Sequence, residues 1–159
     1  MRPRIQLTET MRGQHHFVDP ALGEPTDRPF SFRLVWGAEL PVAMNPLDSR
    51  FMVFDATGTI DVDGLTDGGV PCEGTLRVDY LRERSIAYEL DFALGDRRYR
   101  YSGKKVGIDL LRPIELVKTH TTCYGAIARD DGRVVSKSVA HFEPDELLPF
   151  LMSFRVALA

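Results

Sequence analysis

Histidines are the residues of this sequence best suited to chemistry near neutral pH, because imidazole changes its charge there and binds metals. His15 and His16 are adjacent, so on a strand they point to opposite faces and do not both bind one metal ion without distortion. If Met11 faces inward with period two, His15 faces inward as well and His16 faces outward. His120 and His141 lie in segments rich in strand formers. For each histidine we favour a structural, hydrogen-bonded role over a catalytic one.

Most other catalytic and binding motifs are missing from the sequence. It contains no Gly-x-Ser-x-Gly nucleophile elbow and no Gly-x-Gly-x-x-Gly dinucleotide loop. The basic segment 102–105 lacks the glycine spacing and the hydroxyl of a phosphate-binding loop, so we interpret it as a solvated strand end. Asp61, Asp63 and Asp67 are close together, but their spacing does not match a calcium-binding loop, and we interpret them as turn residues. The sequence therefore predicts neither a metal site nor a cofactor.

Length and composition are those of one globular domain. The chain has 159 residues, 43% of them hydrophobic, with 20 Lys and Arg against 23 Asp and Glu for a formal charge of −3. This balance argues against a nucleic-acid partner, which needs a broad cationic surface. No apolar run approaches the ~20 residues of a membrane span, and the first residues lack the apolar core of a secretory signal. We therefore expect one domain over residues 1–159, soluble and cytoplasmic.

The elements that must position these residues are short strands. The clearest runs over residues 85–92, where every second side chain is apolar, and a second alternating segment covers residues 98–104 after a short turn. Together they predict an antiparallel hairpin. Its polar face would set Glu89 and Asp91 across from Arg98 and Arg100, and such pairs of opposite charge support a hairpin.

Similar patterns predict further strands at residues 5–17, 30–40, 50–54, 58–62, 73–80, 114–128 and 134–142. Residues 130–132, Asp-Asp-Gly, predict a tight turn between the last two, since Asp and Gly tolerate positive φ. Glu143–Leu148 predicts one short C-terminal helix, because a proline and acidic residues favour its first turn. The closing segment 153–158 alternates again and can return to the sheet.

Sequential antiparallel strands with almost no helix must hide their edges. They do so by closing into a barrel or by pairing two sheets. We predict an all-β fold, an antiparallel up-and-down β-barrel with one short C-terminal helix, and keep a β-sandwich as the alternative. At this length an eight-stranded barrel encloses one small ligand or is filled by its own side chains.

The apolar residues at alternating strand positions either fill a core or line a pocket. Filling is the simpler expectation, since small barrels are often packed solid. A pocket would be mostly apolar with a few placed polar groups, which suits a lipid or a sterol-like ligand. The candidate ligand-binding residues are Met11, His15, Phe17, Trp36, Tyr88, Tyr101 and Thr121.

Three short motifs in the chain match a known pattern. They are Glu9-x-Met11-x-Gly13, Tyr101-x-Gly103-x-Lys105 and the Thr-rich segment 119–122. Together they resemble the lipocalin-like (calycin-type) β-domain found beside glucose-methanol-choline oxidoreductases of the cholesterol oxidase type. The resemblance spans most of the chain. It implies a β-barrel that acts as an accessory or binding domain, with an oxidoreductase as partner and no flavin site of its own.

Three functions follow from these observations. The first is a non-enzymatic barrel that binds a hydrophobic small molecule or serves as accessory subunit of an oxidoreductase. The second is a structural protein, whose signature would be a homodimer without a ligand. The third is an enzyme in the barrel mouth that acts on a lipid-like substrate, with His15 or His120 as general base beside Glu9 or Asp109. We favour the first, and place the enzyme last.

Overall fold

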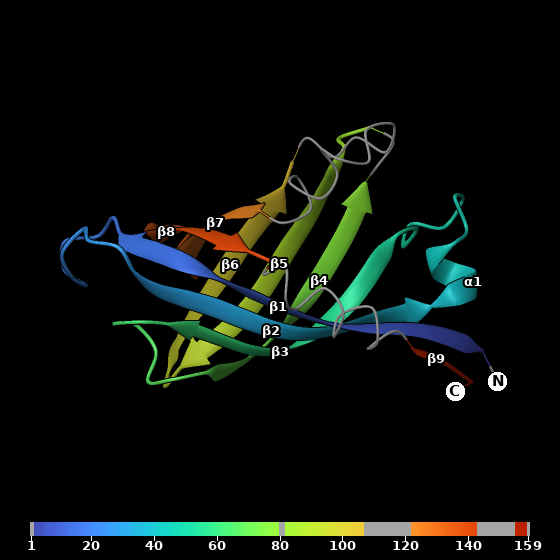
Figure 1. The fold of residues 1–159 in the computed structure, drawn as a ribbon, viewed down its shortest axis with the longest axis horizontal. Helices are drawn as coiled ribbons and strands as arrows, with labels where there is room; N and C mark the ends of the chain where they lie inside the picture. The colour runs from blue at the N-terminus through green and yellow to red at the C-terminus, as the bar shows by residue number, and fades with distance from the viewer. Residues whose placement is uncertain (1, 80–81, 107–121, 143–154, 159) are drawn as a thin grey trace.

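The computed structural model describes residues 2–79, 82–106, 122–142 and 155–158 of the chain. The described segments form one four-residue helix and nine strands, shown in Figure 1. In chain order they are β1 (Pro3–Phe17), β2 (Arg28–Glu39), α1 (Leu40–Ala43), β3 (Val53–Val62), β4 (Val70–Asp79), β5 (Ser85–Leu94), β6 (Arg97–Lys105), β7 (Thr122–Arg129), β8 (Val134–His141) and β9 (Arg155–Leu158).

Eight of the strands close into an antiparallel barrel. Each strand from β2 to β8 pairs with the next along the chain, and β1 closes the ring by pairing with both β2 and β8. The ninth strand, β9, is added to the first residues of β1, where Pro3 lies opposite Leu158. The predicted up-and-down barrel is confirmed, and the alternative of two packed sheets is wrong because the single sheet closes on itself.

The strands of the barrel are strongly staggered. Starting at Gln6, successive cross-strand pairs lead around the barrel through Glu89 and Lys137 and return to β1 at His16, ten residues further along. A stagger of this kind requires the strands to tilt against the barrel axis. It also explains why β1 needs fifteen residues to pair with β2, β8 and β9.

The barrel has two different ends. One end, which we call the hairpin end, is where β1 and β3 finish. It also contains the tight turn between β5 and β6 and the one between β7 and β8. At the N-terminal end, β1 begins and β2, β4, β6 and β8 finish. Both chain termini and α1 lie at this second end (Figure 1).

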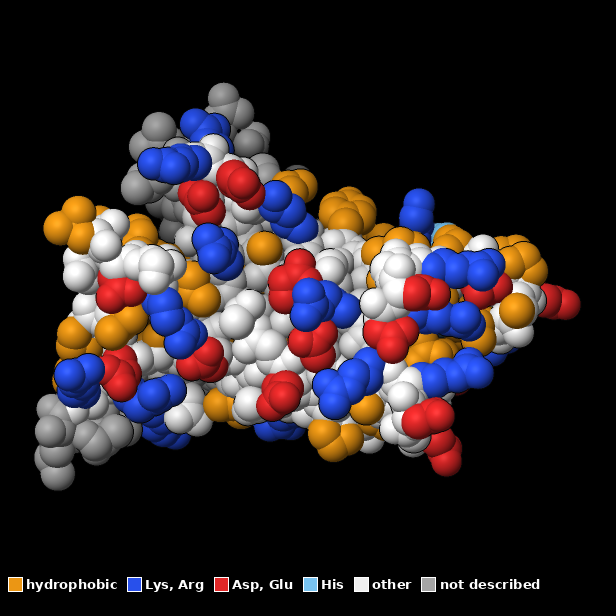
Figure 2. Space-filling model, turned by 180° about the vertical axis from the view of Figure 1, so that it is seen from behind, with side chains coloured by type: hydrophobic (Ala, Val, Ile, Leu, Met, Phe, Trp, Pro, Cys, Tyr) orange, Lys and Arg blue, Asp and Glu red, His pale blue; other side chains and the backbone are white. Residues whose placement is uncertain are grey.

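The predicted hairpin of β5 and β6 is confirmed, with a different register on its polar face. The turn places Leu94 opposite Arg97, so Asp91 falls opposite Arg100. Arg100 donates two hydrogen bonds to Asp91, of 2.8 and 3.1 Å. Glu89 lies opposite Ser102, because the two-residue turn sets this register, and its carboxylate lies 4.0 Å from Nε of Arg100. Figure 2 shows acidic and basic side chains interspersed over the face seen from behind, without a broad cationic patch.

The predicted division of residues 50–62 into two strands is wrong. The segments 50–54 and 58–62 form the single strand β3, which begins at Val53. The strand predicted at about residues 30–40 is confirmed as β2, and the segment that follows Glu39 forms α1, which was not predicted and which contains Pro41 and so lacks a donor for the sheet ladder. The predicted C-terminal helix and residues 114–121 of a predicted strand lie outside the described residues, whereas the return of the chain end to the sheet is confirmed by β9.

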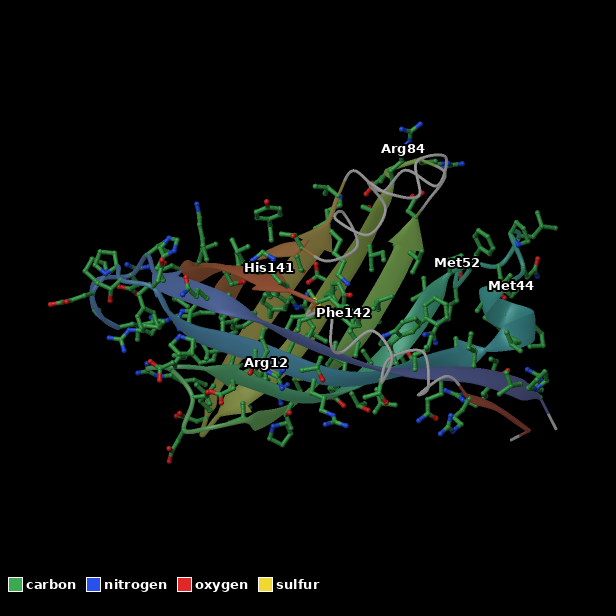
Figure 3. All side chains as sticks on the ribbon, in the orientation of Figure 1. Arg12, Met44, Met52, Arg84, His141 and Phe142 are labelled. Atoms are coloured by element: carbon green, nitrogen blue, oxygen red, sulfur yellow. The ribbon has the colours of Figure 1, made fainter. Side chains whose placement is uncertain are left out.

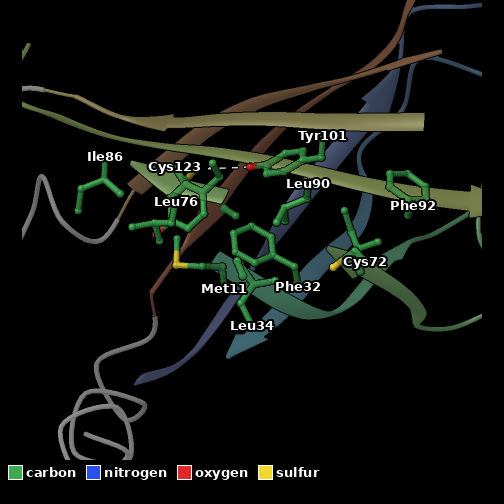
Figure 4. Packing of buried hydrophobic residues seen from close by; sticks show 14 of the residues in the cluster. Met11, Phe32, Leu34, Cys72, Leu76, Ile86, Leu90, Phe92, Tyr101 and Cys123 are labelled. Atoms are coloured by element: carbon green, nitrogen blue, oxygen red, sulfur yellow. Dashed lines mark hydrogen bonds between the residues drawn. The ribbon is translucent and has the colours of Figure 1, made fainter. Parts of the chain in front are cut away.

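Aromatic side chains fill the middle of the barrel. The ring of Tyr101 lies 5.2 Å from that of Phe30 and 5.5 Å from that of Phe32, and Phe32 lies 5.6 Å from Tyr88, measured between centroids. Figure 4 shows Phe32 and Tyr101 among aliphatic neighbours such as Leu90. All four aromatic side chains are buried. Burial of each such side chain stabilises the fold by about 1.5–3 kcal/mol, so this layer is core rather than empty pocket.

Two glycines make room for the ring of Tyr101. A Cβ atom on Gly103 would lie 2.5 Å from the Tyr101 hydroxyl, and one on Gly125 would overlap the same ring. Gly103 and Gly125 are paired across β6 and β7, so the ring lies against two neighbouring strands that lack side chains there. This contact gives the Tyr-x-Gly spacing of β6 a packing role.

Candidate functional site

A cluster of polar side chains crosses the interior of the barrel. Lys105 of β6 donates a hydrogen bond of 2.6 Å to Oε1 of Glu9, which comes from β1. The hydroxyl of Tyr88, from β5, lies 3.0 Å and 2.9 Å from the two carboxylate oxygens of Glu9. Glu9 and Lys105 are each only 4% exposed, and Tyr88 is 1% exposed. We call these three residues the interior cluster.

Strand alternation places the members of the interior cluster. Glu9 faces inward because it shares the parity of Met11 on β1, and Lys105 because it shares the parity of Tyr101 and Gly103 on β6. The interpretation of Lys105 as part of a solvated strand end is wrong. Only the neighbouring Lys104 is exposed, where it forms an ion pair of 2.9 Å with Glu83. The signal that could have found Lys105 is its parity, together with the need of a buried cation for an acid.

The charges of the interior cluster are held in a low-dielectric environment. Burial raises the pKa of Tyr88 well above its ordinary value of 10.0, and the nearby Glu9 carboxylate raises it further. Tyr88 therefore stays protonated at neutral pH and donates to Glu9. The ammonium of Lys105 also lies 5.4 Å from the centroid of the Tyr88 ring, within reach of a cation–π contact.

A buried thiol borders the interior cluster. Lys104 of β6 is paired with Tyr124 of β7. Lys105 and Cys123 are the next residues along these two antiparallel strands. The sulfur of Cys123 lies 3.4 Å from the hydroxyl of Tyr101. Burial raises the pKa of Cys123 to about 11. The thiol is therefore protonated at neutral pH and is a poor nucleophile.

His15 closes the hairpin end of the barrel. It is 1% exposed and faces inward, as predicted, while His16 points to the other face and is half-buried. The ring of His15 lies 5.0 Å from that of Phe17, edge to face, and the guanidinium of Arg28 covers the Phe17 ring at 5.7 Å. The buried Asp19 also lies at this end. Its carboxylate forms an ion pair of 3.6 Å with the guanidinium of Arg129, at the end of β7.

Both ring nitrogens of His15 are occupied by protein groups. Nε2 lies 2.8 Å from the carbonyl oxygen of Asp63, and Nδ1 lies 2.8 Å from the hydroxyl of Ser136. Burial lowers the pKa of His15 below its ordinary value of 6.5, so the ring is neutral at pH 7. A carbonyl only accepts, so Nε2 of the neutral ring carries the proton and donates it to Asp63, which leaves Nδ1 as an acceptor. The one hydroxyl proton of Ser136 is shared between Nδ1 of His15 and the carbonyl oxygen of His16, which lies 3.1 Å from the hydroxyl oxygen. This geometry offers no free nitrogen for a general base.

The candidate ligand-binding residues lie at different levels of the barrel. Tyr88 belongs to the interior cluster, and Met11 and Tyr101 are buried in the middle layer. His15 and Phe17 belong to the hairpin end, whereas Trp36 is half-buried near the N-terminal end with its ring 5.1 Å from that of Phe54. Thr121 lies outside the described residues, as do His120 and Asp109 of the enzyme hypothesis. Glu9 and Lys105 were not among the predicted ligand-binding residues.

Within the residues that the structure describes, no three His, Cys, Asp or Glu side chains gather in a way that would hold a metal ion. The same part of the chain contains no helix long and apolar enough to cross a membrane. The fold and the interior cluster define the class of this protein as a closed eight-stranded β-barrel with a charged pair inside. No protein-family model, curated protein or solved structure matches this chain. The relation to the oxidoreductase-associated domain therefore stays a prediction based on short motifs.

Proposed function

We propose that this protein is a non-enzymatic barrel that binds one hydrophobic, lipid-like small molecule in the part of its interior nearest the N-terminal end. The observation that carries the proposal is the interior cluster. Replacing a buried ion pair by apolar residues of similar volume is often neutral or stabilising, so folding by itself does not require Glu9 and Lys105. A few polar groups in an otherwise apolar interior are typical of a site that orients a ligand.

The two ends of the barrel support entry from the N-terminal end. The hairpin end is tied together by the contacts of His15, Phe17 and Asp19. At the N-terminal end, β2 and β3 are joined by a long connection that includes α1, with Met44 and Leu47 exposed. A lipid-like molecule that enters here meets the interior cluster before the packed aromatic layer.

Backbone strain also lies at the N-terminal end. Met52 and Arg84 are the non-glycine residues with positive φ among those described, at 56° and 50°. Figure 3 shows both at the edge of the barrel where β3 and β5 begin. Such conformations are costly, and they cluster at ligand clamps and switch segments. We therefore assign the entrance to this edge.

The accessory role beside an oxidoreductase is part of the same proposal and is supported by the motif resemblance. Two of the three motifs meet in the interior cluster, since Glu9 belongs to one and Lys105 to the other. A barrel that holds a hydrophobic molecule would serve such an enzyme by carrying a substrate or product. The enzyme hypothesis has less support, because both ring nitrogens of His15 are occupied.

Native mass spectrometry of the purified protein, before and after organic extraction, tests the proposal. We expect an additional mass in the range of a lipid, which extraction removes and which re-addition of the extract restores. Lys105→Met should lose the bound mass, whereas the matched control Lys104→Met, which alters an exposed neighbour, should keep it. An apo mass throughout, together with no binding of added lipids to folded protein, would contradict the proposal.

A further inference from the structure

The charge balance of the interior cluster restricts the chemistry of a molecule that binds there. Glu9 and Lys105 carry one charge of each sign and lie 2.6 Å apart. The only other buried acid among the described residues is Asp19, which belongs to the hairpin end. The buried charges that the described residues place around Lys105 therefore balance without a ligand.

The interior cluster has hydrogen-bonding capacity left over. An ammonium group has three N–H donors, and among the described residues Lys105 uses one of them, on Glu9. Lys105 donates to Oε1 of Glu9, and the single hydroxyl proton of Tyr88 lies within reach of both Oε1 and Oε2. Each carboxylate oxygen has two lone-pair positions. With respect to the residues that the structure describes, two donors of Lys105 and two acceptor positions of Glu9 thus remain.

An uncharged oxygen matches this remaining capacity. A hydroxyl oxygen accepts a hydrogen bond from Lys105 and donates one to Oε2 of Glu9, and a carbonyl oxygen accepts from Lys105. Neither changes the charge of the interior. A carboxylate would bring a second negative charge beside Glu9, and an unbalanced buried charge is strongly unfavourable.

We propose that the interior cluster binds an uncharged, oxygen-bearing head group of an apolar ligand and discriminates against ionised acids. This inference rests on the proposed function and adds the chemical class of the ligand. It predicts that an alkyl alcohol binds more tightly than the fatty acid with the same alkyl chain. The difference comes from the head group alone, because the two molecules bury the same chain.

Titration of extracted protein at pH 7.5 with 1-undecanol and with dodecanoate, which carry the same eleven-carbon alkyl chain, followed by native mass spectrometry and calorimetry, tests the inference. We expect the dissociation constant of the alcohol to be at least about tenfold lower. In the double variant Glu9→Gln/Lys105→Met, which removes both charges, the preference should shrink to less than about threefold. Lys104→Met should keep the wild-type preference.

The outcomes separate the two proposals. Equal or tighter binding of dodecanoate would overturn the inference and leave the binding function in place. Binding of neither compound would overturn the binding function, and the inference with it. An unchanged preference in a folded double variant would show that the interior cluster is not where the head group binds. The wild-type comparison needs no variant, so the inference is tested even where the double variant does not fold.

Discussion

The ammonium of Lys105 lies 2.6 Å from the carboxylate of Glu9, although 96 residues separate them in the chain. The two side chains start from β1 and β6, which are not neighbours in the barrel, and meet across its interior. Tyr88 joins them from β5. The interior cluster therefore connects opposite walls of the barrel and provides its only described buried ion pair of lysine and glutamate.

Removing one member of this pair should destabilise the protein strongly. Lys105→Met leaves the Glu9 carboxylate buried without its cation, at an expected cost of about 3–5 kcal/mol. The double variant Glu9→Gln/Lys105→Met should recover a large part of this loss, because no charge remains buried. Urea unfolding followed by circular dichroism measures both.

The exposed neighbour supplies the control for this comparison. Lys104 is half exposed and pairs with Glu83 at the surface, so Lys104→Met should leave the unfolding midpoint nearly unchanged. A Lys105→Met variant as stable as Lys104→Met would show that the pair contributes little to the fold.

His15 should make stability depend on pH. The pKa of His15 in the folded protein lies below the ordinary value of 6.5, which we take for the unfolded chain. At a pH between these two pKa values His15 is protonated in the unfolded chain but neutral in the folded protein. The folded state therefore loses stability as the pH falls below 6.5 and keeps it above. Urea midpoints measured at pH 7.5 and at pH 5.5 should show this loss in the wild type.

Two histidine variants isolate the contribution of His15. His15→Gln can still donate to the carbonyl of Asp63 and accept from Ser136, but it does not titrate. Its free energy of unfolding should therefore decrease less between pH 7.5 and pH 5.5 than that of the wild type. His141→Gln, which changes an exposed ring, should retain the wild-type decrease. An identical pH dependence in all three proteins would exclude His15 as its source.

A methyl group at Gly103 should disturb the middle layer of the barrel. Its position is occupied by the ring of Tyr101, so Gly103→Ala should cost about 1–3 kcal/mol of unfolding free energy. Gly69→Ala is the matched control, because the nearest side-chain atom lies 3.6 Å from the added carbon and the backbone has no positive φ. Thermal unfolding of the two variants compares them directly, and equal stability would contradict the packing role of Gly103.

The two cysteines should be unreactive in the folded protein. Burial raises the pKa of both Cys72 and Cys123 to about 11. At pH 8 only about one thousandth of such thiols is ionised, and access is blocked as well. Iodoacetamide followed by mass spectrometry should modify neither cysteine in buffer and both in urea. Rapid modification of Cys123 in buffer would show that the barrel opens beside Lys105.

Local patterns were sufficient for most of the strands. The alternation of residues 85–92 predicts β5, because a strand with one buried face needs an apolar side chain at every second position. The same rule predicts that His15 faces inward. The sequence also limits the fold to a closed barrel or two paired sheets, since so many antiparallel strands without covering helices must hide their edges, and the pairing of β1 with both β2 and β8 decides for the barrel. The short helix α1 was missed because Pro41 acts through a missing backbone donor rather than through the hydrophobic pattern.

The sequence by itself determined which residues of β1 and β6 share a face, because side-chain direction in a strand depends only on parity. It did not determine what those residues meet. The distance between Glu9 and Lys105 depends on the ten-residue stagger that carries the register around the ring from Gln6 to His16, which no local segment encodes. Only the closed barrel brings Glu9 and Lys105 together. On an open strand Lys105 would be solvated, whereas inside the barrel it is buried against the Glu9 carboxylate.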